Sequence, residues 1–314
     1  MLVNSGSRHR PDTVADIAKS MPQCHGLLHQ QQEFKRQGSS MQVIGLCRFS
    51  YPALGGFQVE HDRIEDRIAY LYAADRMEER FRHFEAITLP GLKAQTDGDF
   101  TLLIVIGDQL PKPYHDRLTD LISDFPQARV VAQPPRNHRQ VMAEVLNDAR
   151  DDLGQPCLQF RHDDDDAVAV TFVQRLREAA VDCKALLRNH RLVGFDFNRG
   201  YIARPDAAGI LAEETVTPYW GVALAMAVKP WARHTIMNFG HNRLNRFMPT
   251  VTFTHENMYV RGHNDHNDSR QGKRVTKVNL KRLDLEGEAN FEETFAISAD
   301  AVREIFAGQP VFAE

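Results

Sequence analysis

The sequence predicts an α/β protein with a mostly parallel sheet that is flanked by helices. Residues 100–106, Phe-Thr-Leu-Leu-Ile-Val-Ile, are apolar almost throughout, as in a central parallel strand. Strand-like and helix-like segments alternate through the first half of the chain, which favours right-handed crossovers between parallel strands. Four consecutive aspartates, at positions 163–166, directly follow another strand-like run. Because ligands of such sheets bind beyond the carboxyl ends of the strands, this order also predicts where the site lies.

The elements of the first half follow from apolar periodicity and from helix breakers. Short apolar runs rich in strand-forming residues predict strands, and apolar residues at helical spacing predict helices. Pro90 and Gly91 are expected to end the first helix. The predicted strands are residues 43–47, 100–106, 129–132 and 157–162. The predicted helices are residues 76–89, 114–122, 140–151 and 168–180.

The second half is less regular and predicts a smaller antiparallel region. Residues 192–197 and 200–203 are expected to form antiparallel strands about the turn Asn198-Arg199-Gly200. Residues 223–228 predict a further strand, and residues 232–246 predict a helix. A polar segment rich in His, Asn and Asp follows.

The domain organisation is predicted from shifts in composition. Residues 1–40 are rich in His, Gln, Ser and Arg and lack apolar periodicity, so we expect a disordered N-terminal appendage, although a docking arm is the alternative. Met41 resembles a second start, and whether Met1 or Met41 is the physiological one stays open. Residues 41–170 and 171–314 are expected as two halves, the second ending in a C-terminal helix.

Composition excludes several classes of protein. The 314 residues are 42% hydrophobic and 25% charged, and their formal charge of −4 gives no basic field for nucleic acid. The four cysteines lie far apart without a CxxC pair, which favours a reducing, cytoplasmic location and gives no zinc signature. No apolar run approaches the roughly 20 residues that span a bilayer, so any contact with the inner face of a membrane would be peripheral.

The aspartate run predicts a cation site. Carboxylates this close repel one another, so water or a cation must neutralise them. Mg²⁺ and Mn²⁺ prefer oxygen ligands and often bridge carboxylates to substrate phosphates. The run therefore indicates chemistry on a phosphate-bearing substrate.

Three segments carry a resemblance to a known family. They are Arg48-Phe49-Ser50, the segment Phe-Glu-Ala-Ile-Thr-Leu-Pro-Gly-Leu at 84–92 with Gln95-Thr96-Asp97, and Arg-His-Asp-Asp-Asp-Asp-Ala at 161–167. With the order of strands and helices, they resemble the bacterial rhamnosyltransferase family of nucleotide-sugar glycosyltransferases, which have the GT-A fold. The resemblance covers most of residues 41–270. It implies a Rossmann-type sheet. It also implies that the first half of the chain, residues 41–170, binds the nucleotide sugar and that the second half, residues 171–314, binds the acceptor.

The resemblance assigns roles within the aspartate run. It implies transfer of a sugar, with rhamnose suggested by the family name, from a nucleotide diphosphate donor to a glycan or glycolipid. Asp163 would lie near the ribose, Asp164 would be a spacer on the donor side, and Asp165 and Asp166 would hold Mn²⁺ or Mg²⁺. A second reading of the motif pairs Asp164 with Asp166. His263 is expected as the late metal ligand, with His266 as its rival and a solvated surface loop as the alternative for the whole segment.

Further candidates come from position in the sequence. An inverting transferase needs a general base, and Asp265, Glu256 and Glu214 are candidates in decreasing order, each of which fits equally an ordinary surface acid. Arg48 is expected at the diphosphate or nucleotide, with a surface salt bridge as the alternative. Asp108 is expected at the base or ribose, with a simple turn as the alternative.

Two aromatic and basic features stay open. Trp220 would stack on a sugar ring or pack in the core. Residues 273–277 with Lys281-Arg282 form a basic stretch that would contact anionic lipid or an acidic glycan, or remain a solvated face.

Two other classes of function compete with a glycosyltransferase. A magnesium-dependent nucleotidyltransferase or phosphohydrolase would use clustered aspartates equally well, but the phosphate loop GxxxxGK[ST] is absent from the sequence. A calcium-dependent carbohydrate-binding protein would use them structurally, but the spacing of an EF-hand is absent.

Overall fold

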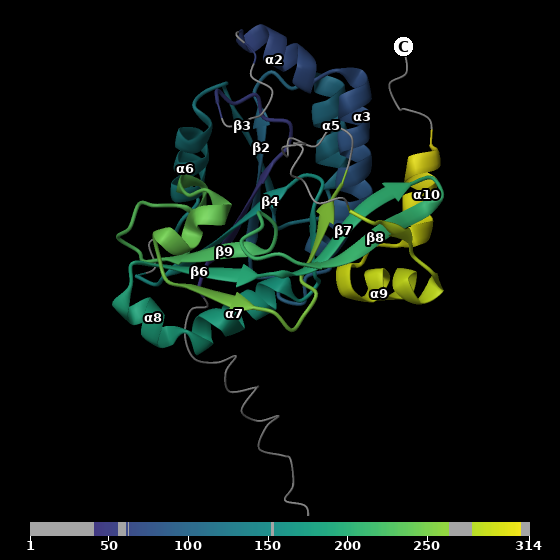
Figure 1. Ribbon diagram of the computed structural model, residues 1–314. Coiled ribbons are helices and arrows are strands. Elements are labelled where there is room, and N and C mark those ends of the chain that lie inside the picture. Colours follow the sequence, from purple (N-terminus) through teal and green to yellow (C-terminus); the bar gives the residue numbers. More distant parts are fainter. Residues whose placement is uncertain (1–40, 56–60, 62, 152–153, 264–277, 309–314) are drawn as a thin grey trace, which may run out of the picture. The chain divides into compact units, whose positions relative to one another are not determined.

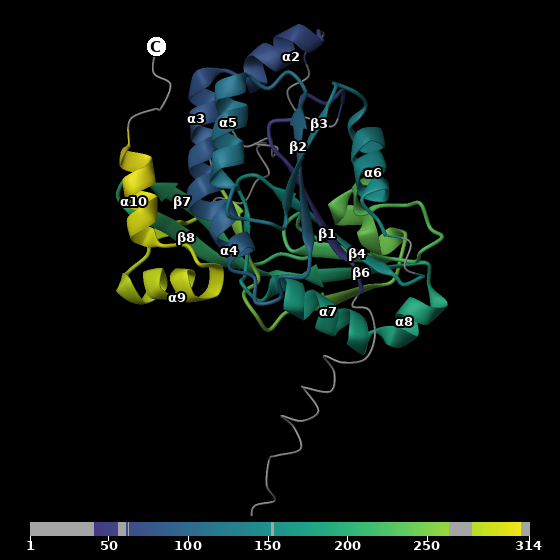
Figure 2. The ribbon, with the colours of Figure 1, turned by 180° about the vertical axis from the view of Figure 1, so that it is seen from behind.

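The computed structural model describes residues 41–55, 61, 63–151, 154–263 and 278–308. The expected appendage at residues 1–40 lies outside the described residues. The described residues from Met41 to Gly308 form one compact unit (Figures 1 and 2).

A seven-stranded, mostly parallel sheet forms the centre of this unit. Its strand order is β10-β6-β9-β4-β1-β2-β3. The strands are β1 Val43–Arg48, β2 Thr101–Gly107, β3 Ala128–Gln133, β4 Cys157–Asp163, β6 Leu192–Phe197, β9 Leu224–Val228 and β10 Thr250–Phe253. All neighbouring pairs are parallel except those of β9 with β4 and β6. The predicted α/β class is therefore confirmed.

A second sheet of five strands supplies the predicted smaller antiparallel region. Its order is β12-β8-β7-β11-β5, and only the β11–β7 pair is parallel. The strands are β5 Ala167–Val168, β7 Arg199–Asp206, β8 Gly209–Val216, β11 Tyr259–Gly262 and β12 Lys281–Arg282. Because β5 follows the aspartates directly, this sheet begins where the candidate site lies.

Helices cover both faces of the large sheet. They are α2 Ile64–Leu71, α3 Ala74–His83, α4 Leu89–Lys93, α5 Lys112–Leu121, α6 His138–Asp148, α7 Phe172–Asp182, α8 Lys184–Asn189, α9 Leu285–Phe295 and α10 Ala299–Ala307. In both views α3 and α5 lie side by side, away from α6, and α9 and α10 lie beside β7 and β8 (Figures 1 and 2). None of the described helices is long and apolar enough to cross a bilayer.

Alternation along the strands creates a core on each face of the large sheet. In β1, Val43 and Cys47 belong to the core beneath α3, α5 and α7, whereas Ile44 and Leu46 belong to the core beneath α6. Strand β2 is buried on both faces in the same way, which is why its sequence is continuously apolar. Strand β1 therefore lies between two packed cores.

The first helix does not end at Pro90 and Gly91, contrary to the prediction. A π-helical turn, Phe84–Thr88, joins α3 to α4, and α4 contains both residues. Pro90 lies near the start of α4, directly after the π-helical turn, so the helical segment passes through it and does not end there. Gly91 allows a close approach, because a Cβ there would lie 2.4 Å from the carbonyl oxygen of Val168.

The predictions for residues 168–171 and for a hairpin of β6 and β7 are also wrong. Residues 168–171 do not begin a helix, because Val168 belongs to β5 and α7 starts at Phe172. Strands β6 and β7 form no hairpin, because they belong to different sheets and β7 pairs with β8 around Gly209, whose φ is +122°.

The helix expected at residues 232–246 is replaced by two short 3₁₀ turns, Ile236–Asn238 and His241–Arg246. The Asn238 side chain accepts hydrogen bonds from the backbone and hydroxyl of Thr235. Such local side-chain bonds compete with helix formation.

Candidate functional site

Two strand ends bring the first pair of charges together. Arg48 ends β1 and Asp163 ends β4, and the parallel register sets the two residues opposite each other. Arg48 Nη2 donates to Asp163 Oδ1 at 2.8 Å. Arg48 Nη1 also lies 3.2 Å from Nε2 of His138, at the start of α6. An arginine only donates, so Nε2 of His138 is unprotonated. Burial, reinforced by Arg48, lowers the pKa of His138 to about 3.

Asp163 is surrounded by three guanidinium groups. Burial alone would raise its pKa, but Arg48, Arg161 and Arg261 outweigh that effect and hold the pKa of Asp163 well below its usual range. Arg261 Nη1 lies 3.6 Å from Asp163 Oδ2. Asp163 is therefore a permanently ionised carboxylate at the centre of the site.

Helix α3 supplies the partner of the next two aspartates. Arg80 Nη1 lies 2.7 Å from Asp164 Oδ1 and 3.3 Å from Asp165 Oδ2, and all three side chains are buried. One turn earlier on the same helix face, Arg76 donates to Ser50 Oγ at 3.1 Å, in the loop that follows β1. Burial raises the pKa of Asp164 to about 6, with Arg80 opposing and Asp165 adding to the rise.

The second sheet supplies the partner of the last aspartate. Strand β11 pairs with β5, which places Arg261 and Gly262 beside Asp166. Arg261 Nη1 donates to Asp166 Oδ2 at 3.0 Å, and the Gly262 N–H donates to Asp166 Oδ1 at 3.0 Å. A Cβ at Gly262 would lie 2.3 Å from the carbonyl oxygen of Asp165, so only glycine fits there.

These bonds decide whether the aspartates fit a divalent ion. Among the residues that the structure describes, no three His, Cys, Asp or Glu side chains are placed to hold a metal. Both oxygens of Asp166 accept hydrogen bonds, and Asp163 and Asp164 each place an oxygen on an arginine. The described side chains, as arranged, do not fit Mg²⁺ or Mn²⁺. The predicted ligand set of Asp165, Asp166 and His263 would require these arginine bonds to open.

The histidine expected as the late metal ligand follows β11 directly. The backbone N–H of His263 donates to the carbonyl of Ala203 at 2.8 Å, extending the β11–β7 pairing, and the side chain is half-buried. Asp265 and His266 lie outside the described residues. The structure thus places β11, which ends at Gly262, beside the aspartates. It does not describe Asp265 or His266.

The other predicted acids lie in ordinary surroundings. Glu256 is 2.8 Å from Arg175 of α7, and Glu214 is 2.6 Å from Arg199 of β7. Asp108 is exposed at the end of β2, where its N–H donates to the carbonyl of Gln133 at 3.1 Å. Asp108 therefore lies at the carboxyl edge of the sheet, in a turn, and its role at the nucleotide stays a prediction.

Trp220 and the basic stretch were the remaining candidates. The Trp220 ring is half-buried and meets the Tyr259 ring edge to face, with centroids 5.9 Å apart, so it packs on the core. Residues 273–277 lie outside the described residues. Arg282 pairs with Asp206 at 2.8 Å on the surface.

His241 belongs to the site without any signal in the sequence. Its Nδ1 lies 2.7 Å from the carbonyl oxygen of Tyr219. A carbonyl only accepts, so Nδ1 carries the proton and Nε2 presents a lone pair. Burial lowers the pKa of His241, and the charges of Arg161 and Arg261 contribute to the lowering. His241 is thus a neutral imidazole within the field of the arginines.

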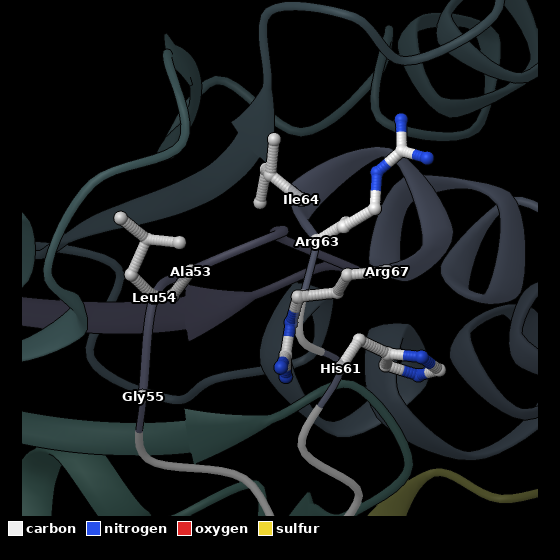
Figure 3. A pocket seen from close by; sticks show the side chains of 7 residues that line it. All are labelled: Ala53, Leu54, Gly55, His61, Arg63, Ile64 and Arg67. Atoms are coloured by element: carbon white, nitrogen blue, oxygen red, sulfur yellow. The ribbon is translucent and has the colours of Figure 1, made fainter.

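A pocket lies beside the loop that follows β1 (Figure 3). Its volume is about 190 Å³, and its lining residues are Ala53, Leu54, Gly55, His61, Arg63, Ile64 and Arg67. Leu54 is bonded through its backbone to Arg136 and His138, so the loop is fixed to the start of α6. In Figure 3 the Arg67 guanidinium points into the space between Gly55 and His61, whereas that of Arg63 points away.

The fold and site define an α/β protein with an arginine–aspartate cluster at the carboxyl ends of its central strands. Residues 42–275 match the model of the family described as "Putative rhamnosyl transferase", and the chain belongs to that family. The family resemblance in the sequence is thus confirmed, and membership supports a glycosyltransferase. A search of curated proteins finds no significant match.

Several solved structures are similar to the chain. The S. aureus TarS fragment 1–349 in complex with UDP is 8% identical, with a TM-score of 0.39 and coverage of 71% of this chain and 61% of that one. The same fragment with UDP-GlcNAc is 10% identical, with a TM-score of 0.36 and coverage of 73% and 60%. A 4-diphosphocytidyl-2C-methyl-D-erythritol synthase is 12% identical, with a TM-score of 0.29 and coverage of 70% and 91%. The chain thus spans about three fifths of the TarS fragment.

Proposed function

We propose that the protein is a glycosyltransferase of GT-A type that moves a sugar, with rhamnose as the first candidate, from a nucleotide diphosphate donor to a glycan or glycolipid. The observation that carries the proposal is the family match over residues 42–275, which spans the whole arginine–aspartate cluster from Arg48 to Arg261. A cytoplasmic location and a peripheral contact with the inner membrane face remain predictions from the sequence.

The donor would bind across the carboxyl ends of β1, β2 and β4. Asp163, which Arg48 bonds, would accept a hydrogen bond from the ribose, and Asp108 would lie at the edge of the donor site, at the end of β2. The pocket at Ala53–Gly55 would hold one portion of the nucleotide. It is too small for the whole molecule, because its volume of about 190 Å³ is below the 300–1,000 Å³ typical of sites that enclose a whole ligand.

The reaction exchanges one bond at the anomeric carbon for another. The bond to the diphosphate oxygen breaks and its electron pair stays on that oxygen, while the acceptor oxygen bonds to the opposite face of the sugar. The acceptor hydroxyl gives its proton to a base, and the configuration inverts. Metal dependence stays a prediction from the sequence.

Four side chains are candidates for the base. Asp265, Glu256 and Glu214 are the predicted ones, and His241 joins them because its Nε2 keeps a lone pair and the charges of Arg161 and Arg261 act on its imidazole. His241→Asn keeps a donor for the Tyr219 carbonyl and removes Nε2. If His241 is the base, we expect kcat to fall about 100-fold or more while donor binding is kept. Glu256→Gln and Asp265→Asn, assayed in parallel, would identify the base if the loss appears in one of them instead.

The function is tested by thermal unfolding with UDP, GDP, CDP and dTDP and with their sugar conjugates, each in EDTA and in Mn²⁺. A ligand that binds only the folded state raises the midpoint. We expect one nucleotide family to stabilise the protein and its sugar conjugate to be turned over when a glycan acceptor is added. Absence of any shift, with stabilisation by calcium alone, would contradict a transferase and favour a structural metal site.

A further inference from the structure

Arg161 differs from every other arginine around the aspartates. It lies on β4 two positions before Asp163, so both side chains leave the same face of the strand. Arg48, Arg80 and Arg261 each bond a carboxylate. The Arg161 side chain, only partly exposed, makes no hydrogen bond or ion pair with the residues that the structure describes.

The charged neighbours of Arg161 are two other guanidinium groups as well as two carboxylates. Burial lowers its pKa, and Arg48 and Arg261 lower it further, against the attraction of Asp163 and Asp166. A guanidinium nevertheless stays protonated in proteins. A cation held away from water beside two other cations costs free energy, and a bound anion would offset that cost.

A second segment lies against the Arg161 guanidinium. A Cβ at Gly221 would lie 3.6 Å from Arg161 Nε, so the backbone that follows Tyr219 runs beside this side chain. The same backbone holds His241 through the Tyr219 carbonyl. Arg161 therefore lies between the strand end that carries Asp163 and the segment that carries a candidate base.

We propose that Arg161, together with Arg48 and Arg261, binds the donor diphosphate and stabilises the charge that develops on it during transfer. This inference rests on the proposed function and names the groups that meet the leaving group. As the bond to the anomeric carbon breaks, the electron pair stays on the diphosphate oxygen, and guanidinium N–H groups donate to the phosphate oxygens. Guanidinium groups match phosphate in planar, two-point hydrogen bonds. These cations take the place expected for a divalent ion.

The test measures binding of inorganic pyrophosphate and of the four nucleoside diphosphates by calorimetry, in EDTA and in Mn²⁺. We expect wild-type protein to bind in EDTA and Arg161→Gln to weaken pyrophosphate binding by about 10- to 100-fold. Arg161→Lys should fall between the two, because it keeps the charge and loses the planar geometry. Arg129→Gln, an equal change of charge at an exposed position of β3, is the matched control and should bind as wild type does.

Thermal unfolding of the unliganded variants separates binding from structure. Arg161→Gln should unfold no earlier than wild type, because it removes a crowded cation. Binding that requires Mn²⁺ and is equally tight in Arg161→Gln would overturn the inference and leave the proposed function standing. Earlier unfolding with unchanged pyrophosphate affinity would overturn it in favour of a structural role. Failure of wild type to bind any diphosphate in either condition would overturn the inference and the proposed function together.

Discussion

Four identical aspartates differ because each meets a different neighbour. Asp163 faces three arginines and stays ionised, whereas burial raises the pKa of Asp164 to about 6. Asp166 is fully buried, and its pKa is raised well above the usual value by burial and by Asp165 and Asp163, against Arg261. The negative charge of the run is therefore concentrated on Asp163, at the end of β4.

Asp165→Asn tests the part of Asp165 in donor turnover. Asp165 repels the charged forms of Asp164 and Asp166, so its neutralisation should leave the unliganded protein at least as stable as wild type. Arg80 keeps its bond to Asp164. We expect kcat with the donor found in the nucleotide panel to fall about 100-fold. Asp116→Asn, on the surface of α5, is the control, and unchanged turnover in Asp165→Asn would remove this residue from the mechanism.

Asp196→Asn tests a buried acid outside the run. Asp196 accepts hydrogen bonds from the Tyr219 N–H at 3.0 Å and from Thr252 Oγ1 at 3.2 Å, yet burial raises its pKa from 3.8 to about 6. The folded state therefore binds more protons than the unfolded state between these values, and wild-type stability rises as pH falls through this window. An asparagine can satisfy both partners without a charge.

The expected result is a pH-dependent difference in the free energy of unfolding. Asp196→Asn should gain most over wild type near pH 7, and the gain should shrink by about 2 kcal/mol as pH falls from 7 to 4. Urea unfolding at several pH values measures it. Asp206→Asn should show the opposite slope, because the hydrogen bond from Arg282 lowers the pKa of Asp206. A difference for Asp196→Asn that does not change with pH would contradict the raised pKa.

At the scale of elements, the site depends on β5 meeting both β11 and α4. Gly91 of α4 faces the carbonyl oxygens of Val168 and Phe295, which a Cβ would approach to 2.4 and 3.0 Å. Strand β5 thus lies between a helix and a partner strand immediately after the aspartates. Any displacement of β5 moves Asp166 relative to Arg261.

Gly91→Ala is expected to disturb this contact. Alanine favours a helix interior by up to about 1 kcal/mol over glycine, but forcing a methyl group against two backbone carbonyls costs roughly 1–3 kcal/mol. We therefore expect a lower midpoint of thermal unfolding together with reduced donor turnover. Gly98→Ala meets only the Gln127 amide, at 3.2 Å, and should change neither. A Gly91→Ala protein as stable and active as wild type would show that β5 has room to shift.

Local patterns in the sequence identified what lies within one element. Arg48 and Asp163 were both expected at the nucleotide site, and parallel register pairs them. Arg161 lies on the same face of β4 as Asp163, and the two-residue alternation of a strand indicates this position from the sequence. Arg261 meets Asp166 across 95 positions through β5 and β11, a pairing that no local periodicity indicates. The turn at Asn238 was not predicted, because the apolar spacing favoured a helix there. Side-chain hydrogen bonds between Asn238 and Thr235 replace that helix.

At the scale of the whole molecule, one sheet joins both predicted halves of the chain. Strands β1 to β4 come from residues 41–170, and β6, β9 and β10 come from residues 171–314. Strand β4 pairs with β1 on one side and with β9 on the other. The candidate site therefore lies at a strand that needs both halves to be fully paired.

Two truncated chains test this dependence. Residues 41–314 contain the complete sheet, so we expect that chain to unfold cooperatively and to give the same nucleotide-dependent shift as the full chain. Residues 41–170 alone would expose the β4 edge and the apolar faces that α7 and β9 cover, and exposed edges of this kind pair between molecules. We expect this shorter chain to aggregate. Circular dichroism and light scattering distinguish the two, and a soluble, cooperatively folded 41–170 chain that binds nucleotide would show that the first half is an independent domain.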